Sequence, residues 1–309
     1  MFNTKSNKTL GIIFVLLLIG TILIFTTEST KKERSFKKDI VQIDTSKVTE
    51  ILISPKSNKT NEVKLVKNGK NWNVTTESGK QFLVPKSKII NLLNQLMVIK
   101  PKRLASRSKA KFNEYEVNDS TATRIVVNEG SNKVLNLIIG KFAFKQPRSM
   151  STFVRLADDT DIYEVDGFLD MSFNKKANDF RDETVINSDK NKWNKLRIES
   201  TNSESFEVVN NGSAWLLEGE ITDSTKTDKI LSDLVRLTNN SFIDDVTEQS
   251  LPPVDSKLII ENDLGEPIVI TSYRDASRYI IHSSQNMESY FDGEKIGEKI
   301  SLNKSSFLK

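Results

Sequence analysis

The chain has no cysteine and only one histidine, His282, among its 309 residues. The lack of cysteine excludes disulfides, thiol nucleophiles, zinc–thiolate sites and a lipoprotein anchor. With one imidazole, a Ser-His-Asp arrangement would have to use His282. Because residues 279–282 alternate like a strand, we interpret His282 as a surface or half-buried strand residue.

An excess of one charge is also lacking, since 45 Lys and Arg residues face 41 Asp and Glu residues, which leaves a net charge of +4. This balance gives no general attraction to nucleic acid. The phosphate-binding patterns GxxxxGK[ST] and GxGxxG and the nucleophile pattern GxSxG do not occur in the sequence. We therefore predict a protein that is not an enzyme, with no catalytic, cofactor-binding or metal-ligating residues and no cofactor.

One uncharged run, LGIIFVLLLIGTILIF from Leu10 to Phe25, stands out from the charged chain. With its flanking threonines it is long enough to cross a bilayer core of about 30 Å at about 1.5 Å per residue. A cleaved secretory signal is the alternative, but the run exceeds the ~7–15 apolar residues of a signal core and no A-x-A-like site follows. The run predicts a single membrane-spanning helix.

The orientation of this helix is ambiguous, because two lysines precede it and five bases follow it within residues 31–38. A literal positive-inside count would leave the body in the cytoplasm. A short leading tail usually stays inside, so we expect a signal anchor with the body outside. The predicted layout is a tail and anchor (1–30), a juxtamembrane linker (31–43), a first domain (44–186) and a second domain (187–309). The first domain opens at Asp44-Thr45-Ser46 with a turn or the start of a helix.

The sequence contains an internal repeat, because EVKLVKNGKNWNV at 62–74 recurs as FEVVNNGSAWLL at 206–217. In each copy alternating apolar residues lead into an Asn-Gly pair, at 68–69 and 211–212, whose residues readily adopt the positive φ of tight hairpin turns. Trp72 and Trp215 each stand three residues past the glycine, on the expected return strand. We interpret them as equivalent core positions.

The repeat continues on both sides of these hairpins. ILI at 51–53 corresponds to LRI at 196–198, and a helical apolar pattern follows each hairpin, in KIINLLNQLM and in KILSDLVRL. RIVVNEGSNKVLNLIIG then matches KLIIENDLGEPIVITSY, and STFVRLADDTDIYEV loosely matches ASRYIIHSSQNMESYF. We predict an α+β protein with two tandem related domains, each an antiparallel sheet with a packed helix.

Two charged segments have alternative interpretations. The first, KPKRLASRSKAK from Lys100 to Lys111, could contact anionic lipid or an acidic partner. Alternatively it forms a solvated loop whose positive charges are favourably placed at the carboxyl end of the preceding helix. It has no interleaved aromatic residue, which argues against nucleic acid. Asp158-Asp159-Thr160-Asp161 is interpreted as an acidic turn between strands, because it lacks the remaining ligand spacing of a calcium loop.

The ends of both domains carry further predictions. From Asp166 to Phe180 we expect one short helix that closes the first domain. Arg181 follows, and we expect it to tie this segment to the first domain through carbonyls or a carboxylate, a functional role being the alternative. Leu251-Pro252-Pro253 predicts a stop before a strand. Gly293 to Leu302 is expected to be a charged tail that caps a sheet edge.

Five segments follow one another in the order RSFKKDIVQIDTSKVTEILI, KLVKNGKNWNV, a helix, KFNEYEVNDS and FVRLADDTDIYEVDGFLDMSFNKKANDFRDETVI. This order resembles the bacterial domain of unknown function 4340 family over nearly the whole chain. The resemblance implies a protein of the inner (cytoplasmic) membrane, since such proteins are often encoded beside ABC-2-type transporters with gliding-motility-like components. It supplies no catalytic residue. Where the family commonly has Tyr-Gly-Leu, this chain has Tyr115-Glu116-Val117, which puts the glycine turn in doubt.

The resemblance thus implies a non-enzymatic, membrane-anchored accessory or scaffold subunit of an ABC-type export or gliding-motility-like machine, with the transporter's membrane subunits as partners. An alternative is a cell-envelope module that binds glycan or lipid in a groove between the repeats, since domain interfaces favour pockets. A hydrolase would require two convergent carboxylates in opposed environments.

Overall fold

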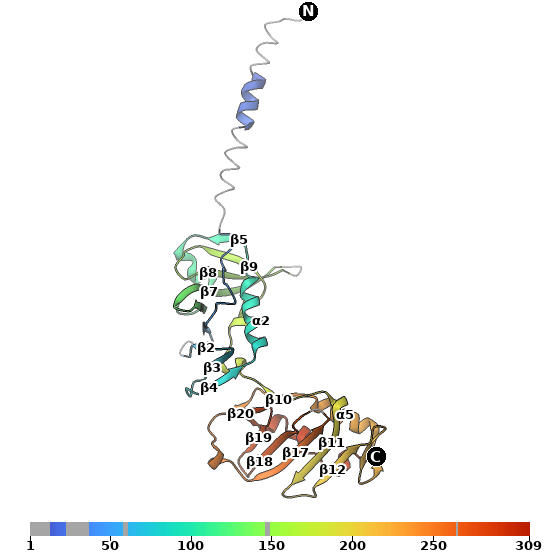
Figure 1. Cartoon of the computed structure of the whole chain (residues 1–309). Helices are drawn as coiled ribbons and strands as arrows, with labels where there is room; N and C mark the ends of the chain where they lie inside the picture. The colour runs from blue at the N-terminus through green and yellow to red at the C-terminus, as the bar shows by residue number, and fades with distance from the viewer. Residues whose placement is uncertain (1–12, 23–36, 58–60, 146–148, 264) are drawn as a thin grey trace, which may run out of the picture. The chain divides into compact units, whose positions relative to one another are not determined.

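The computed structural model of the protein describes residues 13–22, 37–57, 61–145, 149–263 and 265–309. Over these residues the fold is α+β, with two nine-stranded, mostly antiparallel sheets (Figure 1). The predicted α+β class with two antiparallel sheets is confirmed, whereas the membrane-spanning helix that belonged to this prediction is not found among the described residues. By compactness the chain divides into unit 1, Met1–Lys47 with Leu93–Phe173, and unit 2, Val48–Leu92 with Asn174–Lys309. The predicted domain boundaries at residues 44 and 187 remain predictions.

The first sheet has the strand order β4-β3-β2-β1-β6-β7-β8-β9-β5. Its strands are β1 (Glu50–Ser54), β2 (Val63–Asn68), β3 (Asn71–Thr75), β4 (Gln81–Val84), β5 (Pro101–Ser106), β6 (Thr123–Glu129), β7 (Asn132–Lys145), β8 (Ser149–Leu156) and β9 (Ile162–Asp166). The helical segments of this half are α2 (Lys86–Met97), η1 (Lys109–Lys111), α3 (Phe112–Tyr115), α4 (Leu169–Phe173) and η2 (Ala177–Phe180).

The second sheet has the order β14-β13-β12-β11-β17-β18-β19-β20-β16. Its strands are β11 (Trp193–Ser200), β12 (Phe206–Asn210), β13 (Trp215–Leu217), β14 (Glu220–Ile221), β16 (Phe242–Ile243), β17 (Val254–Asn262), β18 (Ile268–Arg274), β19 (Tyr279–Ser283) and β20 (Asn286–Asp292). The helical segments are η3 (Lys190–Lys192), α5 (Ser224–Leu234), η4 (Glu248–Ser250), η5 (Gly293–Lys295), α6 (Gly297–Ile300) and η6 (Lys304–Ser306). Matching strands occupy matching places in the two sheets, as the predicted tandem repeat requires. β10 (Thr184–Asn187) and β15 (Arg236–Thr238) form a separate two-stranded sheet.

The two tryptophan hairpins agree in register but differ in their turns. Trp72 lies opposite Lys67 and Trp215 opposite Asn210, and these partners are equivalent positions of β2 and β12. Asn68 pairs with Asn71, so the first turn has Gly69 and Lys70 at its centre, with Gly69 at φ 58°. This is the glycine-first arrangement of type II′ turns. The expectation that asparagine would also take positive φ is wrong, because Asn68 ends the strand ladder.

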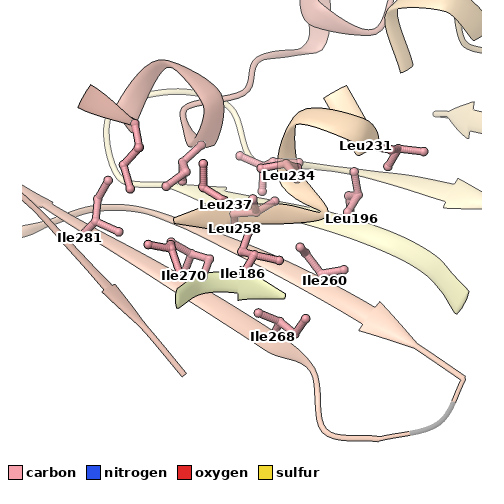
Figure 2. Packing of buried hydrophobic residues seen from close by; sticks show 14 of the residues in the cluster. Ile186, Leu196, Leu231, Leu234, Leu237, Leu258, Ile260, Ile268, Ile270 and Ile281 are labelled. Carbon is pink, nitrogen blue, oxygen red and sulfur yellow. The ribbon is translucent and has the colours of Figure 1, made fainter. Parts of the chain in front are cut away.

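The core of the second copy joins helix α5 to one face of its sheet (Figure 2). α5 begins at Asp223, whose carboxylate accepts the Lys226 amide at 2.9 Å and so caps the helix. Leu231 and Leu234 of α5 belong to one buried cluster with the sheet side chains Leu196, Leu258, Ile260, Ile268 and Ile270. Trp215 is partly buried against this cluster. The predicted helix on one face of the sheet is confirmed for this copy.

In the first copy, α2 buries the predicted apolar stripe. Its buried members are Ile89, Leu92, Leu93 and Leu96, whereas Met97 is exposed. Spacings of three and four residues place the buried four on one face of the helix. Trp72 is also buried, which confirms its interpretation as a core position.

Two predictions about the domain ends are wrong. Residues 166–180 form two separate helical segments, α4 and η2, because Asn174 is engaged by the amide and hydroxyl of Ser57 and Asp179 accepts the Lys176 amide to start a new turn. The carboxyl-terminal tail does not cap a sheet edge. It buries Ile296, Ile300 and Phe307 in the second core.

The amino-terminal predictions are covered only in part. Residues 13–22 are helical, whereas 1–12 and 23–36, which include both ends of the predicted membrane segment, lie outside the described residues. In the part of the chain that the structure describes, no helix combines the length and apolar character needed to cross a membrane. The predicted turn at residues 44–46 is confirmed, since Asp44 accepts the amide and hydroxyl of Ser46 at 3.1 and 2.6 Å. The Ser46 and Lys47 partners lower the pKa of Asp44 to about 2.

Candidate functional site

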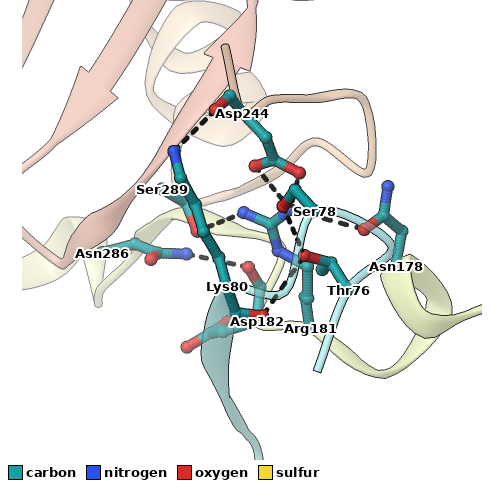
Figure 3. Close-up of polar contacts among 9 residues, drawn as sticks. All are labelled: Thr76, Ser78, Lys80, Asn178, Arg181, Asp182, Asp244, Asn286 and Ser289. Atoms are coloured by element: carbon teal, nitrogen blue, oxygen red, sulfur yellow. Dashed lines mark hydrogen bonds and ion pairs between the residues drawn. The ribbon is translucent and has the colours of Figure 1, made fainter. Parts of the chain in front are cut away.

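The most unusual polar group of unit 2 is the Arg181 side chain, which is fully buried. Arg181 follows η2 in an extended conformation, with φ −64° and ψ 159°. Its Nη1 donates to both carboxylate oxygens of Asp244, at 2.8 and 2.9 Å, and its Nη2 donates to the Ser289 hydroxyl at 3.3 Å (Figure 3). A buried cation is thus neutralised by a carboxylate just after β16.

Two aromatic rings cover the faces of this guanidinium. Its central carbon lies 3.4 Å from the ring centroid of Phe82 and 3.8 Å from that of Phe242. Stacking on both faces suits the planar arginine cation and would not suit lysine. Burial lowers the pKa of Arg181 from its usual value, while the hydrogen bond and charge of Asp244 oppose that shift. Such a group holds its charge and does not exchange protons near neutral pH.

Further hydrogen bonds fix the backbone around Arg181. Lys88 Nζ donates to the carbonyls of Arg181 and Asp179 at 2.7 and 3.0 Å, and Asn286 Nδ2 donates to the Asp182 carbonyl at 2.8 Å. Lys80 Nζ donates to the Asp244 carbonyl at 2.6 Å (Figure 3). These contacts hold together chain segments that are distant in the sequence.

The sequence-based interpretation of Arg181 is therefore half right. It does bind a carboxylate, as expected. That carboxylate, however, belongs to the second half of the chain, whereas the expected partner was the first domain. Phe82 is the contact of the guanidinium group that comes from the first half of the chain. No local sequence signal connects Arg181 with Asp244, which lies 63 residues further along.

A second buried arginine, Arg155, was not singled out from the sequence. Its Nε donates to the Val117 carbonyl at 2.8 Å, its Nη1 donates to the Ala157 carbonyl at 2.8 Å, and its Nη2 lies 2.9 Å from Asp119 Oδ2. The guanidinium carbon lies 4.3 Å from the Phe112 ring centroid. Arg155 thus holds the loop after α3 against β8. The available signal was its place inside the apolar strand FVRLA.

The loop that Arg155 holds includes the departure from the family pattern. Glu116 takes φ 54°, in the left-handed region, at the position where the family resemblance led us to expect a glycine turn. Gly140 of β7 lies beside it, where an added Cβ would be 2.3 Å from the Tyr115 carbonyl oxygen. The turn therefore persists without its glycine, at the steric cost that a side chain has in this conformation.

The acidic turn of unit 1 joins β8 to β9, as predicted. Asp159 forms an ion pair with Lys37 Nζ at 2.9 Å and accepts a hydrogen bond from the Asp161 amide at 3.2 Å. Burial raises the pKa of Asp159, but Lys37 and the amide hydrogen bonds outweigh it, so that the pKa lies below its usual value. Among the described residues, no three histidine or acidic groups gather as a metal ion would require.

The basic segment is not the solvated loop that we considered. Half of it, residues 101–106, forms β5, which pairs with β9 at the edge of the first sheet. Lys102 lies 2.6 Å from Asp166, and Arg103 forms an ion pair with Glu164 of β9. Cross-strand acids therefore neutralise part of its charge.

His282 is a half-buried residue of β19, as predicted. Its ring stacks on Tyr290 with 4.9 Å between centroids, and its Nε2 lies 3.2 Å from the Met287 carbonyl oxygen. Both contacts tie the ring of His282 to the neighbouring strand β20.

Two pockets of unit 2 are lined by more polar than apolar residues. One, of about 340 Å³, has no aromatic residue in its lining, which consists of Pro55, residues 61–64, residues 75–77, Lys176 and Ala177. Another, of about 280 Å³, lies beside the arginine cluster and is lined by Phe82, Leu83, Asp182 and residues 284–289. Its one aromatic ring already stacks on Arg181.

A sequence model of one protein family, described as Domain of unknown function (DUF4340), matches residues 72–256. The match begins at Trp72 of the first hairpin and ends in β17 of the second copy, so it includes Arg155, Arg181 and Asp244. No curated protein and no solved structure matches the chain.

Proposed function

The chain belongs to the DUF4340 family, and on this premise we propose that it is a non-enzymatic, membrane-anchored accessory or scaffold subunit of an ABC-type export or gliding-motility-like machine. The observation that carries the proposal is the uncharged run from Leu10 to Phe25 ahead of two folded copies of one unit. In its described part, the large apolar side chains of residues 13–19 and 22 are 45–66% exposed. Exposure of these side chains to water costs free energy, whereas their exposure to the hydrocarbon core of a bilayer does not.

The contacts of the charged groups support a scaffold in preference to an enzyme. Arg155 and Arg181 are engaged by carbonyls, carboxylates and rings that hold the backbone. The single histidine is accounted for by strand contacts. A folded body that presents protein surface beside a membrane is consistent with these contacts.

We place the protein in the bacterial inner membrane as a single-pass signal anchor, with its body on the extracytoplasmic side and transporter membrane subunits as partners. Crosslinking in intact cells, followed by mild detergent extraction and identification of the crosslinked chains, tests the partners. Transporter membrane subunits are the expected products. Recovery of the uncrosslinked chain alone would contradict the scaffold function.

The side of the membrane is tested separately by adding protease to spheroplasts. The body should be degraded from outside while a cytoplasmic marker protein stays intact. Protection of the body until the membrane is permeabilised would place it in the cytoplasm, as a literal count of flanking charges favours.

Binding of glycan or lipid is the second candidate, and the 280 Å³ pocket is the observation in its favour because both halves of the chain line it. Free aromatic platforms are the usual feature of such sites, and Phe82 is already covered by Arg181. Saturable binding of muropeptide fragments to the purified protein, lost in Leu83→Ser, would favour this function over the scaffold.

A further inference from the structure

Unit 1 has an exposed apolar surface that its own fold does not explain. Among its described residues outside the helix at 13–22, the large hydrophobic side chains that are exposed fall in only three short segments. They are Met97, Val98, Phe142, Phe144, Met150, Phe168 and Met171, which are 37–74% exposed. We call this set the apolar end of unit 1.

The strand register brings these segments to one end of the sheet. Phe144 lies opposite Met150 and Phe142 opposite Thr152 in the β7–β8 hairpin. Thr152 in turn lies opposite Val165, and Val165 opposite Pro101, the first residue of β5. The β7–β8 hairpin, the exit from β9 and the entry into β5 therefore lie level with one another.

Local contacts complete the surface. The Gly167 amide donates to the Met150 carbonyl at 3.0 Å, which holds the start of the α4 segment on β8. The ring of Phe168 then lies 4.7 Å from that of Phe142. Met97 is the last residue of α2 and Val98 follows it, four and three residues before Pro101, so both lie within about 14 Å of Pro101 along the chain. The exposed side chains form a neighbouring group and are not scattered singly.

We propose that the apolar end of unit 1 docks into the interfacial layer of a lipid bilayer, namely the one that holds the anchor, an inference that rests on the membrane attachment in the proposed function. Exposed apolar side chains such as those of phenylalanine insert favourably at the boundary between lipid headgroups and acyl chains. Lys100 lies exposed at the same end, where an ammonium can face anionic headgroups.

The length of the connecting chain allows this contact. Lys37 is fixed to Asp159, at the opposite end of the sheet from the apolar end. The separation is about the length of β8, roughly 24 Å for its eight residues. Residues 26–36 between the anchor and Lys37 can span up to about 40 Å when extended. The tether is therefore long enough for the far end to meet the bilayer, and short enough to keep it near.

The absence of cysteine makes the test direct. The full chain is reconstituted into vesicles of phosphatidylethanolamine and phosphatidylglycerol, with a single environment-sensitive fluorophore on Met150→Cys, Thr160→Cys or Ile19→Cys. Thr160 is the matched control, because it is exposed in the β8–β9 turn at the other end of the sheet. Lipids that carry a nitroxide should quench the label at position 150 at least about three times more than the label at 160.

Each outcome decides between the two proposals. Quenching at position 19 but not at 150 overturns the docking and leaves the anchor intact, whereas no quenching at 19 overturns the anchor itself. A label at 150 that is shielded from aqueous iodide but not reached by lipid nitroxide would show a protein contact, which also overturns the inference. In the Met150→Cys background, Phe144→Ser should reduce lipid quenching without changing the melting curve, since Phe144 is exposed.

Discussion

Replacing Asp244 by asparagine should destabilise unit 2 strongly, because it removes the counter-charge of a fully buried cation. Arg181 has no solvent exposure and donates to both oxygens of Asp244 at 2.8 and 2.9 Å. After Asp244→Asn the guanidinium keeps its charge and its two aromatic neighbours but loses the carboxylate.

The expected loss follows from the burial of the pair. Removing one partner of a buried ion pair costs about 3–5 kcal/mol. The Asp244 side chain is 25% exposed, so water screens part of the interaction, and we expect the lower end, about 3 kcal/mol. In a body of about 150–250 residues this lowers the melting temperature by roughly 6–12 °C. Arg181→Met should cost less, because it keeps the apolar volume and leaves no buried cation.

Tryptophan fluorescence in urea reports this change selectively. The chain has three tryptophans, Trp72, Trp193 and Trp215, and all of them belong to unit 2. The fluorescence transition therefore follows the unfolding of unit 2 without a contribution from unit 1. A shift of the midpoint at constant slope measures the change in stability.

The neighbouring residue supplies a matched control. Asp245 pairs with Arg278 at 2.5 Å, but their side chains are 64% and 43% exposed. Exposed pairs of this kind contribute little, so Asp245→Asn should leave the urea midpoint unchanged. Equal midpoints for the Asp244→Asn and Asp245→Asn variants would refute the reasoning, because the Arg181 charge would then not depend on its buried partner.

Other predictions concern the hairpins, the left-handed turn and a buried phenol. Trp72→Ala should cost about 3–5 kcal/mol and Trp215→Ala less, since Trp72 is buried and Trp215 only partly, as urea midpoints will measure. Glu116→Gly should stabilise unit 1 by about 1 kcal/mol, because glycine adopts φ 54° without steric strain. Gly140→Ala should destabilise unit 1 by about 2–3 kcal/mol, because its Cβ would overlap the Tyr115 carbonyl oxygen. Thermal unfolding followed by circular dichroism measures both changes. Burial, together with Asp161 and Asp159, raises the pKa of Tyr163 to about 12. The raised pKa gives stability that is present below pH 10 and lost as the pH rises through about 12. In an ultraviolet titration, the Tyr163→Phe variant should therefore lack the tyrosine ionisation that occurs at the highest pH in the unmodified protein.

The tandem architecture was predictable because its signals are local and occur twice. Alternation of apolar residues at 63–66 and 206–209 marks strands, and the helical spacing in α2 and α5 marks helices. The order of these signals carries the topology, since sequential antiparallel strands pair with their neighbours. One error in detail was the first turn, where the centre is Gly69-Lys70 because Asn68 still belongs to the ladder.

The partners of charged residues were not predictable from the sequence. Arg181 meets Asp244 and Arg155 meets the Val117 carbonyl only once distant segments are packed together. Periodicity shows which face of a strand is apolar, but not which distant group meets a charge there. The basic segment was misread for a related reason, since the acids that neutralise it lie on β9, about 60 residues away along the chain.

The repeat extends further than we predicted, and this explains the error about the carboxyl-terminal tail. Equivalent strands of the two copies, β9 and β20, each end at an aspartate that is followed by glycine. These pairs are Asp166-Gly167 and Asp292-Gly293. The glycines serve different needs, since Gly167 has φ 95° while a Cβ on Gly293 would lie 2.6 Å from the Tyr279 ring. In both copies a short helical segment follows.

The segments after these Asp-Gly pairs are where the two copies have diverged. In the second copy the tail turns inward and buries Ile296, Ile300 and Phe307 in its own core. In the first copy the chain passes α4 and, from Asn174 onward, belongs to unit 2, where it presents Arg181 to Asp244. One inherited segment thus closes a core in one copy and forms a buried ion pair with a later part of the chain in the other. Substitutions at Phe307 and at Arg181 should therefore both destabilise unit 2, the first by opening a cavity and the second by disturbing a buried charge pair.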